Sequence, residues 1–339
     1  MKINLFCTHR APRDLDFPHE LQSRRDASDP DLLQELDHLI AILTGHGQRD
    51  MTHRLYHVCR HIERVNHHIC IEVEESQLES VARWASDANA IFGLSDGLLR
   101  SPTGGVLLDG DGNSDEDAQL PYPDDAVARK ARHEEWLAQQ GVPVNPMLPP
   151  VVGRDELQLR EPGEVARRAL ALLLSALRAE SIATGNEISL SSLRSRLPRA
   201  YESLTLKEIE FLADEKPEQR TVVNFRYAYE CAYVLQWALG LCDEMTFPGS
   251  ICNVAEVVRR FLQHDESTII EAAMLRPTDE ILDELDMHYR FLWIAREVRL
   301  GRSDFRTDLD PGVLQERCVT LNWLTSFQRA EWDDVDCPA

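Results

Sequence analysis

The chain has 339 residues, of which 36 are Lys or Arg and 58 are Asp or Glu, so its formal net charge is −22. This acidic balance argues against nucleic acid as a main partner, because contacts with phosphates require a basic surface. Hydrophobic residues make up 43% of the chain, which is ample for a buried core, and the longest nearly apolar stretch, residues 231–242, is too short to cross a membrane.

The first 108 residues predict a small α+β domain. Strands are expected at residues 2–7, 90–92 and 105–108, and helices at residues 30–43 and from residue 76 onwards. The apolar residues between 54 and 73 predict two further strands, joined near Val65 and Asn66. The resulting order of strands and helices resembles a ferredoxin-like unit.

Residues 109–150 predict a linker. The segment begins with a run of Asp, Gly and Asn residues and ends in a proline-rich piece, a composition typical of exposed connecting chain. One helix, at residues 124–139, is expected inside it.

Residues 151–339 predict an all-α domain. Apolar residues three and four positions apart indicate helices at residues 164–178, 220–241, 278–300 and 311–328 and after Thr205 and Asn253. Thr205 and Glu208 have the spacing of a capping box, in which each side chain accepts a hydrogen bond from the other residue's amide. In the helix at 164–178, positions 164, 168, 171, 175 and 178 predict one narrow exposed edge.

The acidic charge is spread evenly along the chain. Residues 1–150 carry 25 acids and 14 bases, and residues 151–339 carry 33 acids and 22 bases, so each part has a net charge of −11. No basic binding domain is therefore joined to an acidic tail. The eight cysteines form no CxxC pair, which is typical of reduced thiols in a cytoplasmic protein.

Two patterns match known motifs only in part. Residues 93–97 read G-x-S-x-G, but the extended chain that follows lacks the helix that a nucleophile elbow needs. Asp109, Asp111 and Asn113 have the spacing of calcium ligands, but Ser114 and Leu120 stand where a calcium loop needs Gly and Glu. We therefore expect a turn at residues 93–97 and an acidic loop at residues 109–120.

Histidine and cysteine residues gather between positions 53 and 70. On a helix, His53, His57 and His61 would share one face, and on a strand His57, Cys59 and His61 would do so. Imidazole and thiolate groups are good zinc ligands, so either arrangement could hold a metal. No established ligand spacing is present, so the sequence predicts neither a metal site nor a cofactor, and His57, Cys59 and His61 are kept only as weak candidates.

Polar residues inside the apolar helices of the second domain suggest two alternatives. Arg226 and Glu230 are four positions apart, as are Asp286 and Arg290, so each pair shares a helix face. They would either form structural ion pairs or converge on a polar pocket. The candidate pocket residues are Arg226, Glu230, Asp286, Arg290, Glu316, Arg317, Asn322 and Trp323.

Several runs of the second domain resemble the bacterial family called domain of unknown function 4272. The matching runs are residues 164–170 (EVARRAL), 225–230 (FRYAYE), 235–240 (LQWALG), 309–313 (LDPGV), 321–324 (LNWL) and 332–335 (WDDV). The resemblance implies a helical domain from about residue 120 to 335. It implies no activity, because the family has none assigned.

We expect a soluble, bacterial cytoplasmic protein that acts by binding. An acidic surface without a recognisable catalytic set suits a basic protein partner by complementary charge, as in a toxin-neutralising or other regulatory protein. The alternative is an enzyme or a small-ligand binder with a polar pocket in the helical domain.

Overall fold

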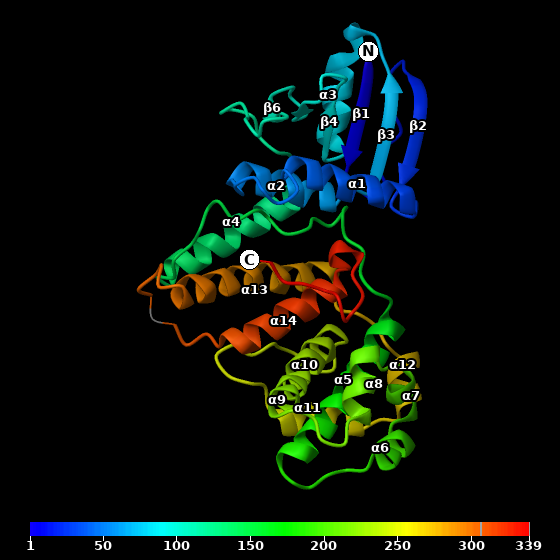
Figure 1. Cartoon of the computed structure of the whole chain (residues 1–339), viewed down its shortest axis with the longest axis vertical. Coiled ribbons are helices and arrows are strands. Elements are labelled where there is room, and N and C mark those ends of the chain that lie inside the picture. The colour runs from blue at the N-terminus through cyan, green and yellow to red at the C-terminus, as the bar shows by residue number, and fades with distance from the viewer. Residues whose placement is uncertain (306, 339) are drawn as a thin grey trace. The chain divides into compact units, whose positions relative to one another are not determined.

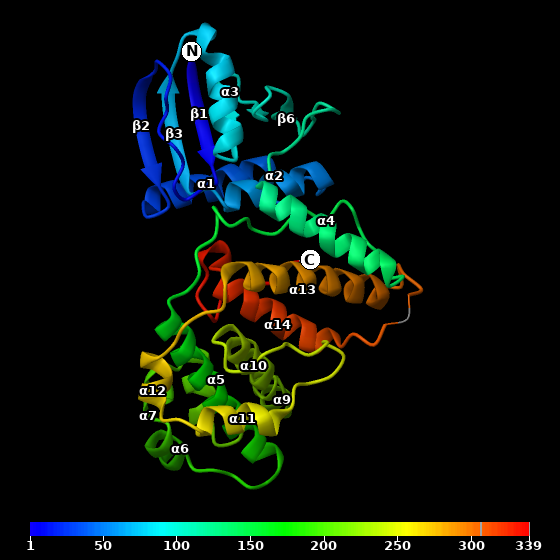
Figure 2. The same ribbon diagram turned by 180° about the vertical axis from the view of Figure 1, so that it is seen from behind.

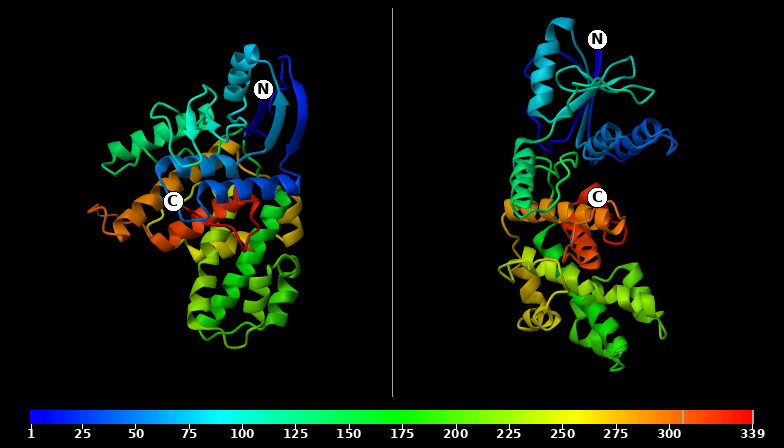
Figure 3. Two further views of the ribbon diagram at one scale, coloured as in Figure 1. Left: turned by 45° about the horizontal axis from the view of Figure 1, so that its top comes forward. Right: turned by 90° about the vertical axis from the view of Figure 1, so that its left-hand side faces the viewer.

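The computed structural model describes residues 1–305 and 307–338 (Figure 1). The chain divides into two compact units. The N-terminal unit contains Met1–Ala131 and Asn145–Leu157, and the helical unit contains Arg132–Val144 and the chain from Gln158 onwards. Figures 2 and 3 show the elements of both units from other directions.

The N-terminal unit is built on an antiparallel sheet. Its strands are β1 (Lys2–Cys7), β2 (Glu20–Asp26), β3 (His67–Glu72), β4 (Ala90–Gly93), β5 (Leu99–Arg100) and β6 (Val106–Leu108). They lie in the order β2-β3-β1-β4-β5-β6, so β1 is central and pairs with both β3 and β4. The presence of both a sheet and helices in this unit confirms the prediction of an α+β N-terminal domain.

Helices pack on both faces of the sheet because side chains alternate across each strand. One core joins α1 (Pro30–Leu43) and α2 (His53–Glu63) to residues such as Ile91 and Leu107. The other joins α3 (Leu78–Asp87) to residues such as Leu5 and Ile71. Apolar strand residues are thereby removed from water on either side.

The prediction of a hairpin at residues 54–73 is wrong in its first half. The segment forms helix α2, then strand β3, instead of two strands. Leu55, Val58 and Ile62 are spaced three and four positions apart and are all buried, which is the helical period. Thr52 starts the helix, since its hydroxyl accepts a hydrogen bond from the amide of Leu55 at 3.2 Å.

Strand β2 has no counterpart in the prediction. It is an edge strand, and most of its side chains are polar and exposed or half-buried. Edge strands of this kind use charged residues to resist pairing with other chains, so they lack the apolar alternation by which a strand is recognised.

The segment expected to be a linker contributes to both units. Residues up to Ala131 and from Asn145 belong to the N-terminal unit, and the stretch between them belongs to the helical unit. Ala118 and Leu120 are buried in the core with α1 and α2. The predicted helix at 124–139 is confirmed as α4 (Asp124–Gln139).

The helical unit is confirmed as all-α over its described residues. Its helices are α5 (Pro162–Ala183), α6 (Leu190–Arg196), α7 (Pro198–Glu202), α8 (Leu206–Ala213), α9 (Gln219–Arg226), α10 (Ala228–Ala238), α11 (Val254–Leu262), α12 (Glu266–Glu271), α13 (Thr278–Arg299) and α14 (Pro311–Leu324). The helix predicted at 220–241 is interrupted at Tyr227, which ends α9 and begins α10. No helix in the described part of the chain is both long and apolar enough to cross a membrane.

Helix α5 lies at the centre of this unit and packs against α10, α9, α7 and α12. The prediction of an exposed edge along it is wrong, because Arg168, Ala171, Ser175 and Arg178 are all buried. Buried guanidinium groups need partners. Arg168 forms an ion pair with Glu208, and Nη1 of Arg178 donates to the carbonyl of Ile188 at 3.1 Å.

Candidate binding pocket in the helical unit

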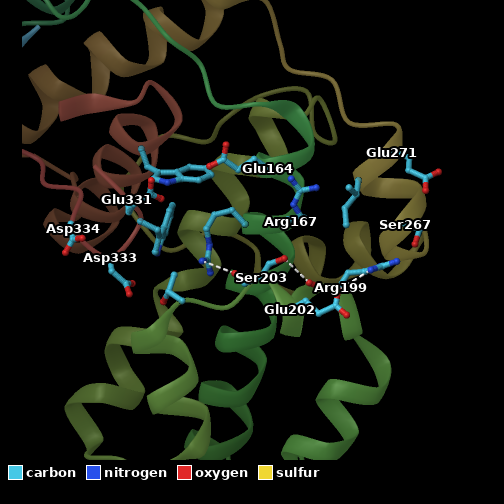
Figure 4. A pocket seen from close by; sticks show the side chains of 15 residues that line it. Glu164, Arg167, Arg199, Glu202, Ser203, Ser267, Glu271, Glu331, Asp333 and Asp334 are labelled. Carbon is cyan, nitrogen blue, oxygen red and sulfur yellow. Dashed lines mark hydrogen bonds and ion pairs between the residues drawn. The ribbon is translucent and has the colours of Figure 1, made fainter. Parts of the chain in front are cut away.

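A pocket of about 760 Å³ opens between the start of α5, helices α7 and α12, and the C-terminal segment (residues 331–334). Figure 4 shows Asp333 and Asp334 at one side and Ser267 and Glu271 at the other. The lining residues are Glu164, Arg167, Arg168, Arg199, Glu202, Ser203, Thr205, Ser267, Ile270, Glu271, Trp323, Glu331, Trp332, Asp333 and Asp334.

Helix ends place the polar residues of the lining. Pro162 is in the first turn of α5, where its fixed φ angle favours a helix start. The carboxylate of Glu266 accepts hydrogen bonds from the amides of Arg199 at 3.0 Å and Ala200 at 2.7 Å, which holds the first turn of α7. The predicted capping box of Thr205 and Glu208 is confirmed and begins α8.

Two arginine and two tryptophan side chains hold the C-terminal segment on the unit, with the two tryptophans in contact and one arginine on each. The guanidinium of Arg160 lies 5.0 Å from the ring centre of Trp323. The rings of Trp323 and Trp332 meet edge to face, with centres 5.3 Å apart. The guanidinium of Arg168 lies 5.1 Å from the ring centre of Trp332. These cation–π and aromatic contacts make Trp332 part of the pocket wall.

Acidic side chains outnumber basic ones in the lining, six to three. Most of these charges are already paired. Arg168 pairs with Glu208, and Arg199 with Glu202 at 3.1 Å. Arg160, outside the lining, contacts Glu164 at 3.0 Å and Glu331 at 3.7 Å. The carboxylate of Asp333 lies 3.5 Å from the amide of Lys207. Glu271 and Asp334 are exposed, and their carboxylates have no partner among the described residues. The pocket is therefore polar and carries excess negative charge at its rim.

A family model described as Domain of unknown function (DUF4272) matches residues 129–335, more than half of the chain. The chain belongs to this family. The matched range contains every residue of the pocket lining. No curated protein matches the chain, and no solved structure does.

Glu230 and Arg317 form a fully buried ion pair in the DUF4272 region. Nε of Arg317 donates to Glu230 at 2.9 Å, and both side chains have no exposed surface. The Arg317 guanidinium also donates to the carbonyl of Thr246, and the amide of Cys252 donates to Glu230. This pair links α10 to α14 and does not line the pocket.

Glu316 lies beside this pair and has no basic partner among the described residues. Sγ of Cys231 donates to its carboxylate at 3.3 Å. Burial raises the pKa of Glu316, and the nearby charge of Glu230 adds to the effect. The structure thus places a carboxyl group that resists ionisation next to a buried thiol.

Asp286 and Arg290 form a second buried cluster, on α13. The two side chains are joined by hydrogen bonds of 2.8 and 2.7 Å, Nδ1 of His133 contacts Asp286 at 2.8 Å, and Glu134 accepts from Arg290 at 2.9 Å. Burial alone would raise the pKa of Asp286, but the hydrogen bonds from His133 and Arg290 outweigh it and lower the pKa.

The remaining candidates are separated. Arg226 pairs with Glu180 at 2.8 Å in a partly exposed position. Asn322 donates to the carbonyl of Asp336 at 2.8 Å and so attaches the chain just after the C-terminal segment. Trp323 is the only one of the eight candidates that lines this pocket.

His57, Cys59 and His61 lie on helix α2 rather than on a strand. His57 contacts the hydroxyl of Tyr122 and the carbonyl of Met147, both at 2.9 Å, and His61 contacts the carbonyl of Phe6 at 3.2 Å. Burial lowers the pKa of His61 to about 4, so its imidazole is neutral. The described residues contain no group of three or more side chains placed to hold a metal ion.

Proposed function

We propose that this protein is a binding protein whose helical unit accepts a positively charged side chain of a basic protein partner. The observation that carries the proposal is the excess of carboxylates over guanidinium groups in the pocket lining, six to three. The other four lining carboxylates already have partners, in Arg160, Arg199 and Lys207, so those of Glu271 and Asp334 remain available to a ligand.

The charge of the whole chain supports the same partner. A net charge of −22 attracts a basic protein over long range and raises the rate of encounter, while the pocket selects where the cation docks. Both effects weaken as salt is added, because charges are screened beyond about 8 Å at physiological ionic strength.

The proposal also covers the cellular compartment in which the protein works and the fold type of the N-terminal unit. The eight cysteines are all free and buried, which favours a reducing compartment such as the bacterial cytoplasm, where a regulatory or toxin-neutralising role would operate. The strand order β2-β3-β1-β4, with each neighbouring pair antiparallel, is that of a ferredoxin-like sheet. No helix lies between β1 and β2 and helices cover both faces, so the proposed likeness is limited to the order of these four strands.

Binding of oligoarginine peptides tests the proposal. We expect a fluorescein-labelled oligoarginine to bind and an oligoglutamate of the same length not to bind. The double variant Glu271→Gln/Asp334→Asn should weaken binding about five- to tenfold, because each exposed charge pair contributes roughly 0.2–1 kcal/mol.

The matched control is Glu116→Gln/Asp117→Asn, which removes the same charge from two exposed residues of the N-terminal unit. It should leave binding nearly unchanged. Equal losses in the two double variants would show that oligoarginine responds to net charge alone, and the pocket would not be the site.

The second candidate function is binding of a small polar molecule, with or without a reaction. The pocket volume of about 760 Å³ favours it, since ligand sites measure roughly 300–1,000 Å³. A thermal-shift screen of small metabolites checks it. A hit whose stabilisation is lost in Trp332→Ala but kept in Glu271→Gln/Asp334→Asn would favour this candidate over the peptide site.

A further inference from the structure

Two large apolar side chains are exposed on α8, beside the pocket. Leu206 has 77% of its surface exposed and Ile209 has 44%. They are three positions apart, so they share one face of the helix. Phe211 and Leu212 of the same helix are buried and supply its contact with the core. The exposed pair is therefore not needed to hold α8 in place.

This exposed pair is continuous with the pocket. Thr205, which lines the pocket, is the N-cap residue of α8 and immediately precedes Leu206. The amide of Lys207 lies 3.5 Å from the carboxylate of Asp333, and its ammonium donates to the carbonyl of Asp333. The first turn of α8 and the acidic wall of the pocket thus form one surface.

Acidic side chains flank the pair, and the ammonium of Lys207, the basic residue between Leu206 and Ile209, is held on the carbonyl of Asp333. Glu210 follows Ile209 and is exposed, as is Asp334 on the pocket wall. A partner that buried Leu206 and Ile209 would therefore have to bring basic side chains with its apolar ones. An acidic or uncharged apolar segment would lack that match.

We propose that Leu206 and Ile209 extend the pocket into a docking surface for a basic amphipathic helix of the partner. Apolar residues of that helix cover Leu206 and Ile209, and an Arg or Lys side chain one or two turns along enters the pocket. This inference rests on the proposed function and adds the partner's apolar face to it. Amphipathic helices bind to surfaces in this way through residues spaced three and four apart.

Two synthetic peptides test this inference. One is an amphipathic helix of Arg and Leu, and the other has the same arginines with Ser in place of each Leu. We expect the Arg–Leu peptide to bind wild-type protein at least tenfold more tightly. The variant Leu206→Ser/Ile209→Ser should lose most of that advantage and keep its affinity for the Arg–Ser peptide. Leu300→Ser, at a residue that is 55% exposed beyond α13, should keep the whole advantage.

The outcomes separate this inference from the proposed function. If both peptides bind with equal affinity, or if Leu206→Ser/Ile209→Ser and Leu300→Ser behave alike, the docking surface is wrong and the cation site stands. If Glu271→Gln/Asp334→Asn binds the Arg–Ser peptide as wild type does, the cation site itself fails. A wild-type dimer that Leu206→Ser/Ile209→Ser converts to a monomer in sedimentation experiments would assign the surface to a second copy of this chain and overturn the inference.

Discussion

The guanidinium of Arg168 lies 5.1 Å from the ring centre of Trp332 and thereby connects the first turns of α5 to the C-terminal segment. Residues 164 positions apart in sequence thus form one wall of the pocket. Arg168 is also paired with Glu208, so two contacts fix its side chain. The pocket depends on this contact for its shape.

Trp332→Ala should destabilise the helical unit by about 2–3 kcal/mol. The substitution removes a cation–π contact of up to roughly 2 kcal/mol and an aromatic pair of roughly 0.5–1.5 kcal/mol. Urea unfolding followed by circular dichroism measures the loss. Trp136→Ala is the control, because Trp136 is 45% exposed and its removal should cost less than about 1 kcal/mol. Equal losses in the two variants would contradict a role for Trp332 in holding the segment.

Glu230→Gln should destabilise the protein by about 3–5 kcal/mol, because it leaves the charge of Arg317 buried without its partner. Glu180→Gln is the control. It breaks the partly exposed pair with Arg226 and should cost less than about 1 kcal/mol. Replacing Glu230 and Arg317 together by Leu and Met should cost less than Glu230→Gln alone. A double variant that is less stable than Glu230→Gln would show that the pair itself contributes net stability.

Local signals predicted helix starts better than they predicted the pocket. Helices were expected at residues 30–43 and 311–328 and after Thr205 and Asn253. Each of these helices is present, with Asp29, Asp310, Thr205 and Asn253 as their N-caps. These predictions succeeded because a cap depends on residues within one turn. Strand β2 escaped prediction for the opposite reason, since only its place at the edge of the sheet explains its polar sequence.

The pocket could not be predicted because its residues come from five places in the chain. Arg168 was expected on an exposed edge, yet it is buried by contacts with α8 and with Trp332. The runs that resemble the family contain Arg168, Trp323 and Trp332. Nothing in the spacing of these three residues along the chain shows that their side chains are in contact. Spacing of four on one helix correctly paired Asp286 with Arg290, but Glu230 pairs with Arg317, 87 positions away, rather than with Arg226.

Asp286 should make the protein less stable in acid. Its pKa is lowered from the ordinary value of 3.8 by the hydrogen bonds from His133 and Arg290, which outweigh burial. A lowered pKa contributes stability that is fully present above the unfolded value and is lost as pH falls through the folded value. Asp286→Asn should therefore lose stability at pH 7 and show a smaller further loss below about pH 4 than wild type does. Urea unfolding at a series of pH values measures both, and parallel curves for the two proteins would contradict the assignment.

Glu316 should make the protein less stable as pH rises, which is opposite to the effect of Asp286. Burial raises its pKa above the ordinary value of 4.5. A raised carboxyl pKa means that the folded state binds the proton more tightly than the unfolded state, so stability falls as pH rises from the unfolded to the folded value. Glu316→Gln keeps the size and the neutral form of the side chain and removes the cost of ionisation. The variant should match wild type near pH 4 and be more stable than wild type at pH 8.

The control for Glu316→Gln is Glu210→Gln, at an exposed position of α8, which should leave the pH dependence unchanged. Sγ of Cys231 donates to Glu316, so Cys231→Ala is informative as well. Removing that donor leaves the burial of the carboxyl group in place and should raise the pKa of Glu316 further. The loss of stability between pH 4 and pH 8 should then be larger in Cys231→Ala than in wild type. A smaller loss would mean that the thiol, rather than burial, keeps the Glu316 carboxyl protonated.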